Sequence, residues 1–257
     1  MLEYKLASGY TMPALGLGTW QLRGQTCIEA VRTALDLGYN HLDTADAYGN
    51  HDAIRQALQG HDPDEIFITT KVRRNDLRHD DVLAMGERAL SELGIDRLDL
   101  LLIHWPNERI PVSETLSAMA ELVEQGKVRS IGVSNFTIRH LEEALPVAEV
   151  PIAVNQVKYH PYHNQQDLLD YCKDNDIVVT AYSPFGNGDL IDDPELQRIA
   201  AKNDRSLPQI VLRWLVAKGL VVIPKSANPD HIAANMQIFD WELDEEDVQA
   251  IEALGRR

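Results

Sequence analysis

The feature that most constrains the fold of this chain is a regular alternation of short apolar runs with longer segments of helical periodicity. Eight runs are almost continuously apolar and are bounded by turn residues; they are LGLGT, HLDTA, IFITTKV, LDLLLIHW, SIGVSN, AVNQVKY, VVTAYS and LVVIPKS. Strands with so few polar positions are buried on both faces, which is typical of a parallel sheet.

Apolar residues spaced by three and four positions predict helices between these runs. The predicted helical segments are 27–38, 51–60, 81–94, 113–126, 138–145, 165–175, 194–204, 229–238 and 240–254. This alternation over 257 residues predicts an α/β fold, a (β/α)8 TIM barrel that forms a single domain over residues 1–257. The opening segment EYKLASGYTMPALG predicts an N-terminal β-hairpin ahead of the first barrel strand.

A doubly wound sheet is the competing fold. It usually begins with a strand followed by the glycine fingerprint of dinucleotide-binding proteins. The segment GLGTWQ has Gly16 and Gly18, but Gln21 stands where the third glycine should be. We therefore interpret this segment as a turn and favour the barrel.

Charge and composition exclude several classes of function. The formal net charge of −16 would repel the phosphates of a nucleic acid. No apolar run has the length of a membrane span, and the N-terminus lacks the basic start and apolar stretch of a signal peptide. We expect a cytoplasmic monomer that binds neither nucleic acid nor membrane.

The sequence gives no indication of a metal site or a disulfide framework. Cys27 and Cys172 are too few and too far apart for either. His160 and His163 flank a proline in one loop, but no fitting third ligand accompanies them. We expect no bound metal.

Four polar residues arrive at one rim of the predicted barrel, where reactive groups of such folds lie. Asp43, Lys71 and His104 end three consecutive strands, and Tyr48 follows in the loop after Asp43. Each has an ordinary explanation when taken alone, such as a cap for Asp43 or a core position for His104. Their coincidence at one rim favours a catalytic site.

These four side chains suit general acid catalysis. A phenol is a weak acid at neutral pH, and a neighbouring cation lowers its pKa. We expect Asp43 to hold Lys71, and Lys71 to lower the pKa of Tyr48, which would donate a proton to a carbonyl oxygen. His104 would hydrogen-bond the same oxygen. Because none of these groups supplies a hydride, a cofactor must do so.

Seven motifs together resemble the aldo-keto reductase family over nearly the whole chain. They are GYNHLDTADAYGN (38–50), TTK (69–71), LLLIHWP (100–106), GVSNF (132–136), NQVKYHP (155–161), YSPFG (182–186) and IPKS (223–226). Small prokaryotic members similar to 2,5-diketo-D-gluconate reductases and methylglyoxal reductases look most alike. The resemblance implies a barrel that binds NADP(H) or NAD(H), with a tetrad of Asp43, Tyr48, Lys71 and His104.

The resemblance also implies which residues contact the cofactor and the substrate. The residues that would hold the nicotinamide are Ser134, Asn135 and Gln156, with Tyr182 stacked on its ring. Those of the pyrophosphate loop would be Ser183, Pro184, Phe185 and Gly186, and those at the adenosine end Lys225, Ser226, His231 and Asn235. The substrate pocket would be lined by Trp20, Tyr48, His104 and Trp105.

Departures from the family pattern bear on specificity. His231 replaces an arginine, whose planar fork suits a 2′-phosphate. We therefore expect NADPH to be preferred with NADH still usable. His51 replaces a glutamate at a position that opens a helix, and we expect that position to tolerate substitution. The short loop PNERIPV and an end at ALGRR predict a broad choice of small carbonyl substrates.

The predicted function is NAD(P)H-dependent reduction of aldehydes, dicarbonyls or keto-sugars to alcohols. One alternative is a non-catalytic nicotinamide-binding regulatory subunit of the same fold. Another is a phosphate-handling barrel isomerase or aldolase. Turnover of a simple aldehyde excludes the first alternative, and dependence on added nicotinamide excludes the second.

Overall fold

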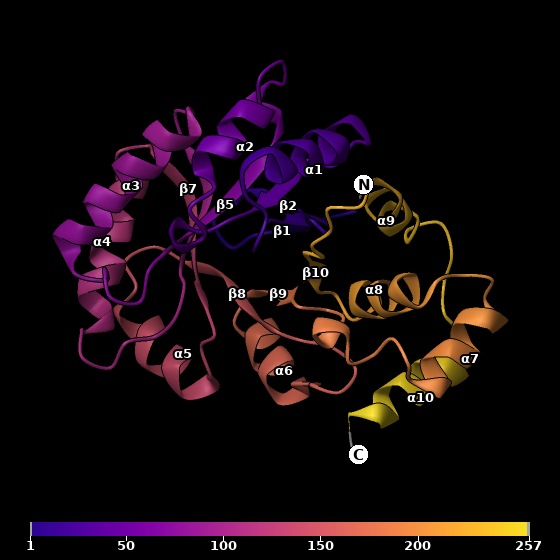
Figure 1. Ribbon diagram of the computed structural model, residues 1–257. Helices are drawn as coiled ribbons and strands as arrows, with labels where there is room; N and C mark the ends of the chain where they lie inside the picture. Colours follow the sequence, from indigo (N-terminus) through magenta and orange to yellow (C-terminus); the bar gives the residue numbers. More distant parts are fainter. Residues whose placement is uncertain (1, 256–257) are drawn as a thin grey trace.

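The protein is a β/α barrel whose computed structural model describes residues 2–255, apart from the side chain of Asn187 (Figure 1). Its parallel sheet follows the order of the sequence and consists of β3 (Leu17–Gly18), β4 (His41–Asp43), β5 (Phe67–Val72), β6 (Leu98–Ile103), β7 (Val128–Ser134), β8 (Ile152–Lys158), β9 (Val178–Tyr182) and β10 (Val221–Val222). A parallel bridge between Leu15 and Val222 joins the first strand segment to the last. The (β/α)8 fold predicted from the sequence is confirmed.

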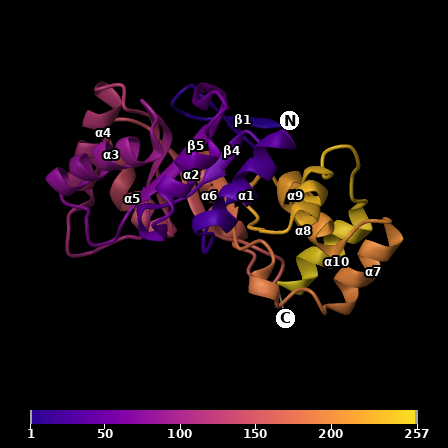
Figure 2. The same cartoon turned by 45° about the horizontal axis from the view of Figure 1, so that its top comes forward.

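Helices cover the outside of the strands, as the two views show (Figures 1 and 2). They are α1 (Gly24–Asp36), α2 (His51–Ala57), α3 (His79–Leu93), α4 (Val112–Glu124), α5 (Ile138–Ala144), α6 (Gln166–Asp174), α7 (Pro194–Lys202), α8 (Leu207–Ala217), α9 (Pro229–Met236) and α10 (Glu245–Leu254). Short 3-10 turns lie at Asp46–Tyr48, Pro63–Glu65, Leu145–Val147 and Gly186–Gly188. Every predicted helical segment overlaps one of these helices, and α1 begins three residues earlier than predicted, at Gly24.

Helix α8 has no counterpart among the predicted segments. Its sequence LPQIVLRWLVA is apolar on most faces, and residues from Gln209 to Val216 other than Arg213 are buried. A helix that is buried nearly all round has no polar stripe, so its periodicity cannot be told from that of a buried strand. The helix begins instead at a capping box, in which Ser206 and Gln209 each satisfy a backbone N–H of the other.

The predicted N-terminal hairpin is also confirmed. Strand β1 (Glu3–Lys5) pairs antiparallel with β2 (Thr11–Pro13). Leu6 and Met12, at the base of this hairpin, are fully buried in a cluster with Phe67, Leu100 and Val154 from the barrel strands. Because Phe67 begins β5, the hairpin closes the barrel at the amino ends of its strands and leaves the carboxyl ends for the site.

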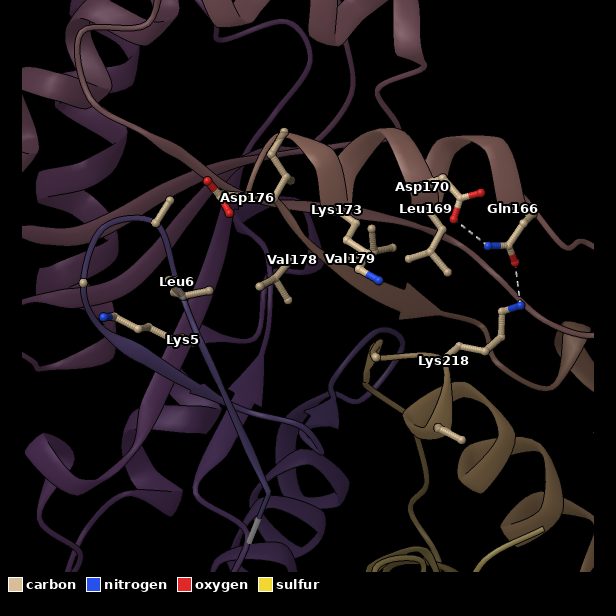
Figure 3. Close-up of a pocket in the computed structure, with 15 residues that line it drawn as sticks. Lys5, Leu6, Gln166, Leu169, Asp170, Lys173, Asp176, Val178, Val179 and Lys218 are labelled. Carbon is tan, nitrogen blue, oxygen red and sulfur yellow. Dashed lines mark hydrogen bonds between the residues drawn. The ribbon is translucent and has the colours of Figure 1, made fainter. Parts of the chain in front are cut away.

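A cavity of about 930 Å³ also lies at the amino ends of the strands (Figure 3). It is bounded by Lys5 of the hairpin, by Val178 at the start of β9, and by Lys218 after α8. Figure 3 shows Lys218 hydrogen-bonded to Gln166. Since Tyr182 ends the same strand that Val178 begins, this cavity and the candidate site lie at opposite ends of the barrel.

None of the helices in residues 2–255 combines the length and the apolar character that crossing a membrane would require.

Candidate active site

The Asp43–Lys71 pair lies at the carboxyl ends of two neighbouring strands. Strands β4 and β5 pair in parallel with Asp43 opposite Thr69, so Lys71 lies two residues beyond the partner of Asp43. The Lys71 side chain is fully buried, and its Nζ donates to Asp43 Oδ1 at 2.5 Å and to the Thr44 carbonyl at 2.7 Å. Burial alone would lower the pKa of Lys71, but the Asp43 carboxylate raises it above its ordinary value. Lys71 is therefore a cation.

Tyr48 and His104 lie against this pair. Tyr48 ends a three-residue 3-10 turn, Asp46–Tyr48, that follows β4. The Lys71 Nζ lies 5.3 Å from the centre of the Tyr48 ring. The Tyr48 and His104 rings meet edge to face, with centroids 5.7 Å apart and an angle of 76° between their planes. The structure thus brings all four predicted residues together.

The electrostatics differ from the sequence expectation in one respect. Burial raises the pKa of Tyr48 above its ordinary value, and this effect exceeds the lowering that Lys71 causes. The expected net lowering of the Tyr48 pKa is therefore wrong. Burial, with a smaller contribution from Lys71, lowers the pKa of His104 to about 4. At neutral pH Tyr48 keeps its proton and His104 is uncharged.

Gln156 contacts the tetrad directly, which the sequence did not predict. Its Nε2 donates to Asp43 Oδ2 at 2.7 Å, so Gln156 and Lys71 occupy one carboxylate oxygen each. The two residues are 113 positions apart in the sequence. No local pattern could have identified this contact, because it depends on the curvature that brings β4 and β8 to one barrel interior.

Ser134, Asn135 and Tyr182 form a second hydrogen-bonded group beside the tetrad. The Asn135 Nδ2 donates to the His104 carbonyl at 3.0 Å, and the Tyr182 hydroxyl donates to Asn135 Oδ1 at 2.8 Å. Ser134 Oγ donates to the Gln156 carbonyl at 2.8 Å. The residues implied to hold a nicotinamide ring are therefore connected to the four implied to perform the chemistry.

The segment implied to cover the pyrophosphate follows Tyr182 at once. Pro184 and Gly186 are buried and Phe185 packs partly against the core, while Ser183 and Gly186 have positive φ angles of 48° and 57°. His160 lies beside Gly186, and both of its buried ring nitrogens lack a hydrogen-bond partner among the residues described. Such unmet hydrogen-bonding capacity, together with the amides above, fits a polar cofactor.

The four residues implied to meet the adenosine end lie farther along the rim. Lys225 is exposed after β10, Ser226 Oγ accepts from the Asn228 backbone N–H at 3.0 Å, and His231 is exposed on α9. Asn235 is buried on the same helix. Within residues 2–255, none of the hydrogen-bond partners of these four residues belongs to the tetrad, so the group lies apart from it.

Trp20 and Trp105 present the exposed apolar surface of the rim. They are 49% and 47% exposed, although large aromatic side chains are usually well buried. Trp105 directly follows His104, and Trp20 follows the buried Thr19 at the end of the first strand segment. Half-exposed tryptophans beside a polar site are suited to contact a ligand.

The expectation that position 51 tolerates substitution is wrong. His51 is buried, with Nδ1 at 2.9 Å from Glu92 Oε2 and Nε2 at 3.0 Å from Thr70 Oγ1. Because Thr70 directly precedes Lys71, the His51 ring ties α2 and α3 to the strand that carries the lysine. Only the tertiary packing reveals this role, since His51 reads as an ordinary first helical residue in the sequence.

Across the part of the chain that the structure describes, no three histidine, cysteine or acidic side chains are grouped closely enough to hold a metal ion.

Comparison with known proteins identifies the family. Residues 14–256 match the Aldo/keto reductase family. A glyoxal reductase from Bacillus subtilis is 42% identical, over 98% of this chain and 92% of its own length. A 9,11-endoperoxide prostaglandin H2 reductase from Trypanosoma cruzi is 39% identical, over 97% of this chain and 90% of its own.

Solved structures agree with this match. MGS-M4, an aldo-keto reductase from a deep-sea metagenome library, superposes with a TM-score of 0.95 at 39% identity, covering 99% of this chain and 96% of its own. An aldo-keto reductase complexed with NADPH superposes with a TM-score of 0.94 at 34% identity, covering 100% of this chain and 89% of its own. This chain therefore belongs to the aldo/keto reductase family and is an NAD(P)H-dependent oxidoreductase.

Proposed function

We propose that the protein reduces small aldehydes and dicarbonyls to alcohols, with Tyr48 as the proton donor. The observation that carries this proposal is the contact of Tyr48 with both Lys71 and His104 at the rim of the barrel. A phenol held between a buried cation and a neutral imidazole is equipped to protonate an oxygen that gains negative charge.

Each residue of the tetrad has a separate role in this reaction. The nicotinamide cofactor, when bound, supplies the hydride to the carbonyl carbon. Tyr48 holds its proton at neutral pH because burial raises its pKa, and it gives that proton to the carbonyl oxygen. The Lys71 cation then stabilises the phenolate that remains. Asp43 keeps Lys71 charged and in place, and the uncharged His104 orients the carbonyl oxygen.

The substrate class follows from the walls of the rim. Trp20 and Trp105 offer apolar surfaces, and the loop Pro106–Pro111 between β6 and α4 is short. Apolar walls discriminate weakly between substrates, by about 1–3 kcal/mol per methylene. The similarity to a glyoxal reductase supports dicarbonyls in particular, since a second carbonyl makes the reacting carbon more electrophilic.

We further propose that NADPH is preferred and that NADH is usable. Lys225 is exposed after β10, so its side chain can reach a phosphate. His231, exposed on α9, offers a phosphate fewer N–H donors than the planar fork of the arginine that the family pattern has there. The similarity to an NADPH-complexed structure supports the same choice.

The decisive experiment compares wild type with Tyr48→Phe on a panel of aldehydes, dicarbonyls and keto-sugars, followed by the absorbance of reduced nicotinamide. Tyr48→Phe keeps the ring and removes the acid, so kcat should fall by about 10²–10⁴. The Kd for cofactor, measured separately by fluorescence, should change by less than about twofold because the phenol binds no part of it directly. Near-normal turnover in Tyr48→Phe would refute Tyr48 as the donor. Cofactor binding without turnover of any carbonyl in wild type would favour the regulatory alternative.

A further inference from the structure

We propose that Asp46 is a positioning residue, which holds the turn that carries Tyr48 through ion pairs with Arg73 and Arg88. This inference rests on the proposed function, because it assigns Asp46 to the support of the proton donor. Asp46 itself touches no atom of the tetrad side chains in the contacts described.

Asp46 is a nearly buried carboxylate with two cationic partners. It is 6% exposed. Its Oδ1 accepts from Arg88 Nη2 at 2.9 Å, and its Oδ2 forms an ion pair with Arg73 Nε. Arg73 follows the end of β5 and Arg88 lies within α3, so the two partners approach from different elements. A buried carboxylate needs such partners, since an unpaired charge would be costly to bury.

Further contacts fix the backbone of the same turn. Arg73 Nη2 donates to the Asp46 carbonyl at 2.8 Å, and Arg23 Nη1 donates to the Tyr48 carbonyl at 2.6 Å. The turn itself closes with two short-range backbone bonds, from the Tyr48 N–H to the Ala45 carbonyl at 2.9 Å and from the Gly49 N–H to the Asp46 carbonyl at 3.3 Å. Arginines thus hold both ends of the segment.

A three-residue 3-10 turn needs this external support. The i→i+3 hydrogen bonds of such turns have poorer geometry than those of an α-helix, so outside contacts add to their stability. The next residue, Gly49, has a φ of 60° and ends the turn in a left-handed conformation. Without the clamp at Asp46, the position of the Tyr48 ring relative to Lys71 and His104 would be free to vary.

The effect of Asp46 should be geometric rather than electrostatic. The charges that shift the pKa of Tyr48 are those of Lys71 and Asp43, and Asp46 is not among them. Its own charge is matched by two arginines. Removing it should therefore misplace the phenol without changing the acidity of the phenol much.

The test variant is Asp46→Asn, which keeps the shape of the side chain and removes the ion pairs. We expect kcat for glyoxal to fall by about tenfold, since displacing a catalytic group by about 1 Å can cost up to about 10²-fold. The Kd for NADPH should stay within about twofold of wild type. The solvent deuterium isotope effect on kcat should rise, because proton donation from a misplaced phenol becomes slower.

The matched control is Asp99→Asn. Asp99 is also 6% exposed, accepts from Arg129 Nη1 at 2.5 Å and from the Ile68 backbone N–H at 2.9 Å, but lies near the start of β6. The substitution removes a buried ion pair of the same kind at the opposite end of the barrel. If the fall of kcat in Asp46→Asn came from a general loss of stability of the barrel, Asp99→Asn should show an equal fall. We expect its kcat and isotope effect to match wild type.

A second variant keeps the inference testable if Asp46→Asn does not fold. Arg88→Gln changes a side chain that is 45% exposed and removes one of the two ion pairs. Arg88→Gln should lower kcat by about threefold, less than the roughly tenfold fall expected for Asp46→Asn. In the double variant, Arg88→Gln should cause no further fall in kcat, because the ion pair is already absent. A kcat within twofold of wild type in Asp46→Asn would overturn the assignment of Asp46, and so would the same result in Arg88→Gln if Asp46→Asn does not fold. An equal fall in Asp99→Asn would overturn it as well. If Tyr48→Phe loses activity while Asp46→Asn and Arg88→Gln keep theirs, the assignment of Asp46 fails and the proposed function stands.

Discussion

At the residue scale, the arrangement around Asp43 explains how a lysine can be buried at the end of a strand. One oxygen of Asp43 accepts from Lys71 and the other from Gln156, so the carboxylate is satisfied on both sides. Lys71 in turn donates to the Thr44 carbonyl. The pair forms one unit, because removing either member leaves the other charge buried without a partner.

The first prediction concerns this pair. Asp43→Asn and Lys71→Met should each lower kcat by about 10², the lower end of a general acid contribution. The double variant should lose less than the product of the two single effects, since both groups serve the same proton transfer. The measurement is a double-mutant cycle on single-turnover rates. Losses that multiply independently would show that the two residues do not act together.

A second prediction at this scale concerns cofactor choice. His231→Arg should lower the KM for NADPH by up to about fivefold, because an exposed ion pair of a guanidinium contributes about 0.2–1 kcal/mol. The KM for NADH, which lacks that phosphate, should be nearly unchanged. His61→Arg adds the same charge in the turn after α2 and serves as the control. An unchanged ratio of the two constants in His231→Arg would place His231 away from the 2′-phosphate.

At the element scale, helix α8 links the barrel wall to the helix that carries His231. Its Gln209 donates from Nε2 to the Ala234 carbonyl of α9 at 3.0 Å. The same side chain completes the capping box with Ser206, whose Oγ accepts from the Gln209 N–H at 3.4 Å. The contacts of Gln209 therefore stabilise the start of α8 and hold α9 against it.

The third prediction tests this cap. Ser206→Ala should lower the free energy of unfolding by about 1 kcal/mol, the usual contribution of such a cap. Ser113→Ala, at an exposed position within α4, should change it by less than about 0.5 kcal/mol. Urea unfolding followed by circular dichroism measures both, and the urea dependence should keep its slope. A Ser206→Ala variant as stable as wild type would show that Gln209 alone holds this end.

At the scale of the whole molecule, burial of neutral histidines makes stability depend on pH. His41 is fully buried beside β5, with Nε2 at 3.3 Å from Thr69 Oγ1. Burial lowers its pKa from 6.5 to about 4, although Asp43 opposes this shift and Lys71 adds to it. Burial lowers the pKa values of His104 and His160 to about 4 in the same way. These three residues favour the folded state only while they are uncharged.

The fourth prediction follows from the sign of these shifts. Above pH 6.5 the stabilisation by neutral His41 is fully present, and it is lost as pH falls towards 4 because the unfolded chain binds the proton first. Each such histidine contributes a slope of about 1.4 kcal/mol per pH unit in that window. His41→Asn should make the decline shallower by about one such slope. Urea unfolding between about pH 6.5 and 4.5, the window of this titration, measures it. Equal slopes in wild type and His41→Asn would contradict the prediction.

Much of the fold was determined by the sequence alone. Burial on both faces makes a barrel strand apolar throughout, and one-sided burial gives its helix a 3.6-residue stripe, so both are visible as local patterns. Since all strands of a parallel barrel run the same way, residues that end successive strands must share a rim. Asp43, Tyr48, Lys71 and His104 could therefore be placed together without coordinates.

Other features were decided only by the tertiary structure. Helix α8 escaped prediction because it is buried almost all round and has no stripe. The contacts of Gln156 with Asp43, of His51 with Thr70 and of Arg88 with Asp46 join residues 113, 19 and 42 positions apart. Even the direction of the Tyr48 pKa shift was decided by its burial. Local sequence determines which face of an element is apolar, whereas hydrogen-bond partners and desolvation depend on how curved, packed elements bring distant residues together.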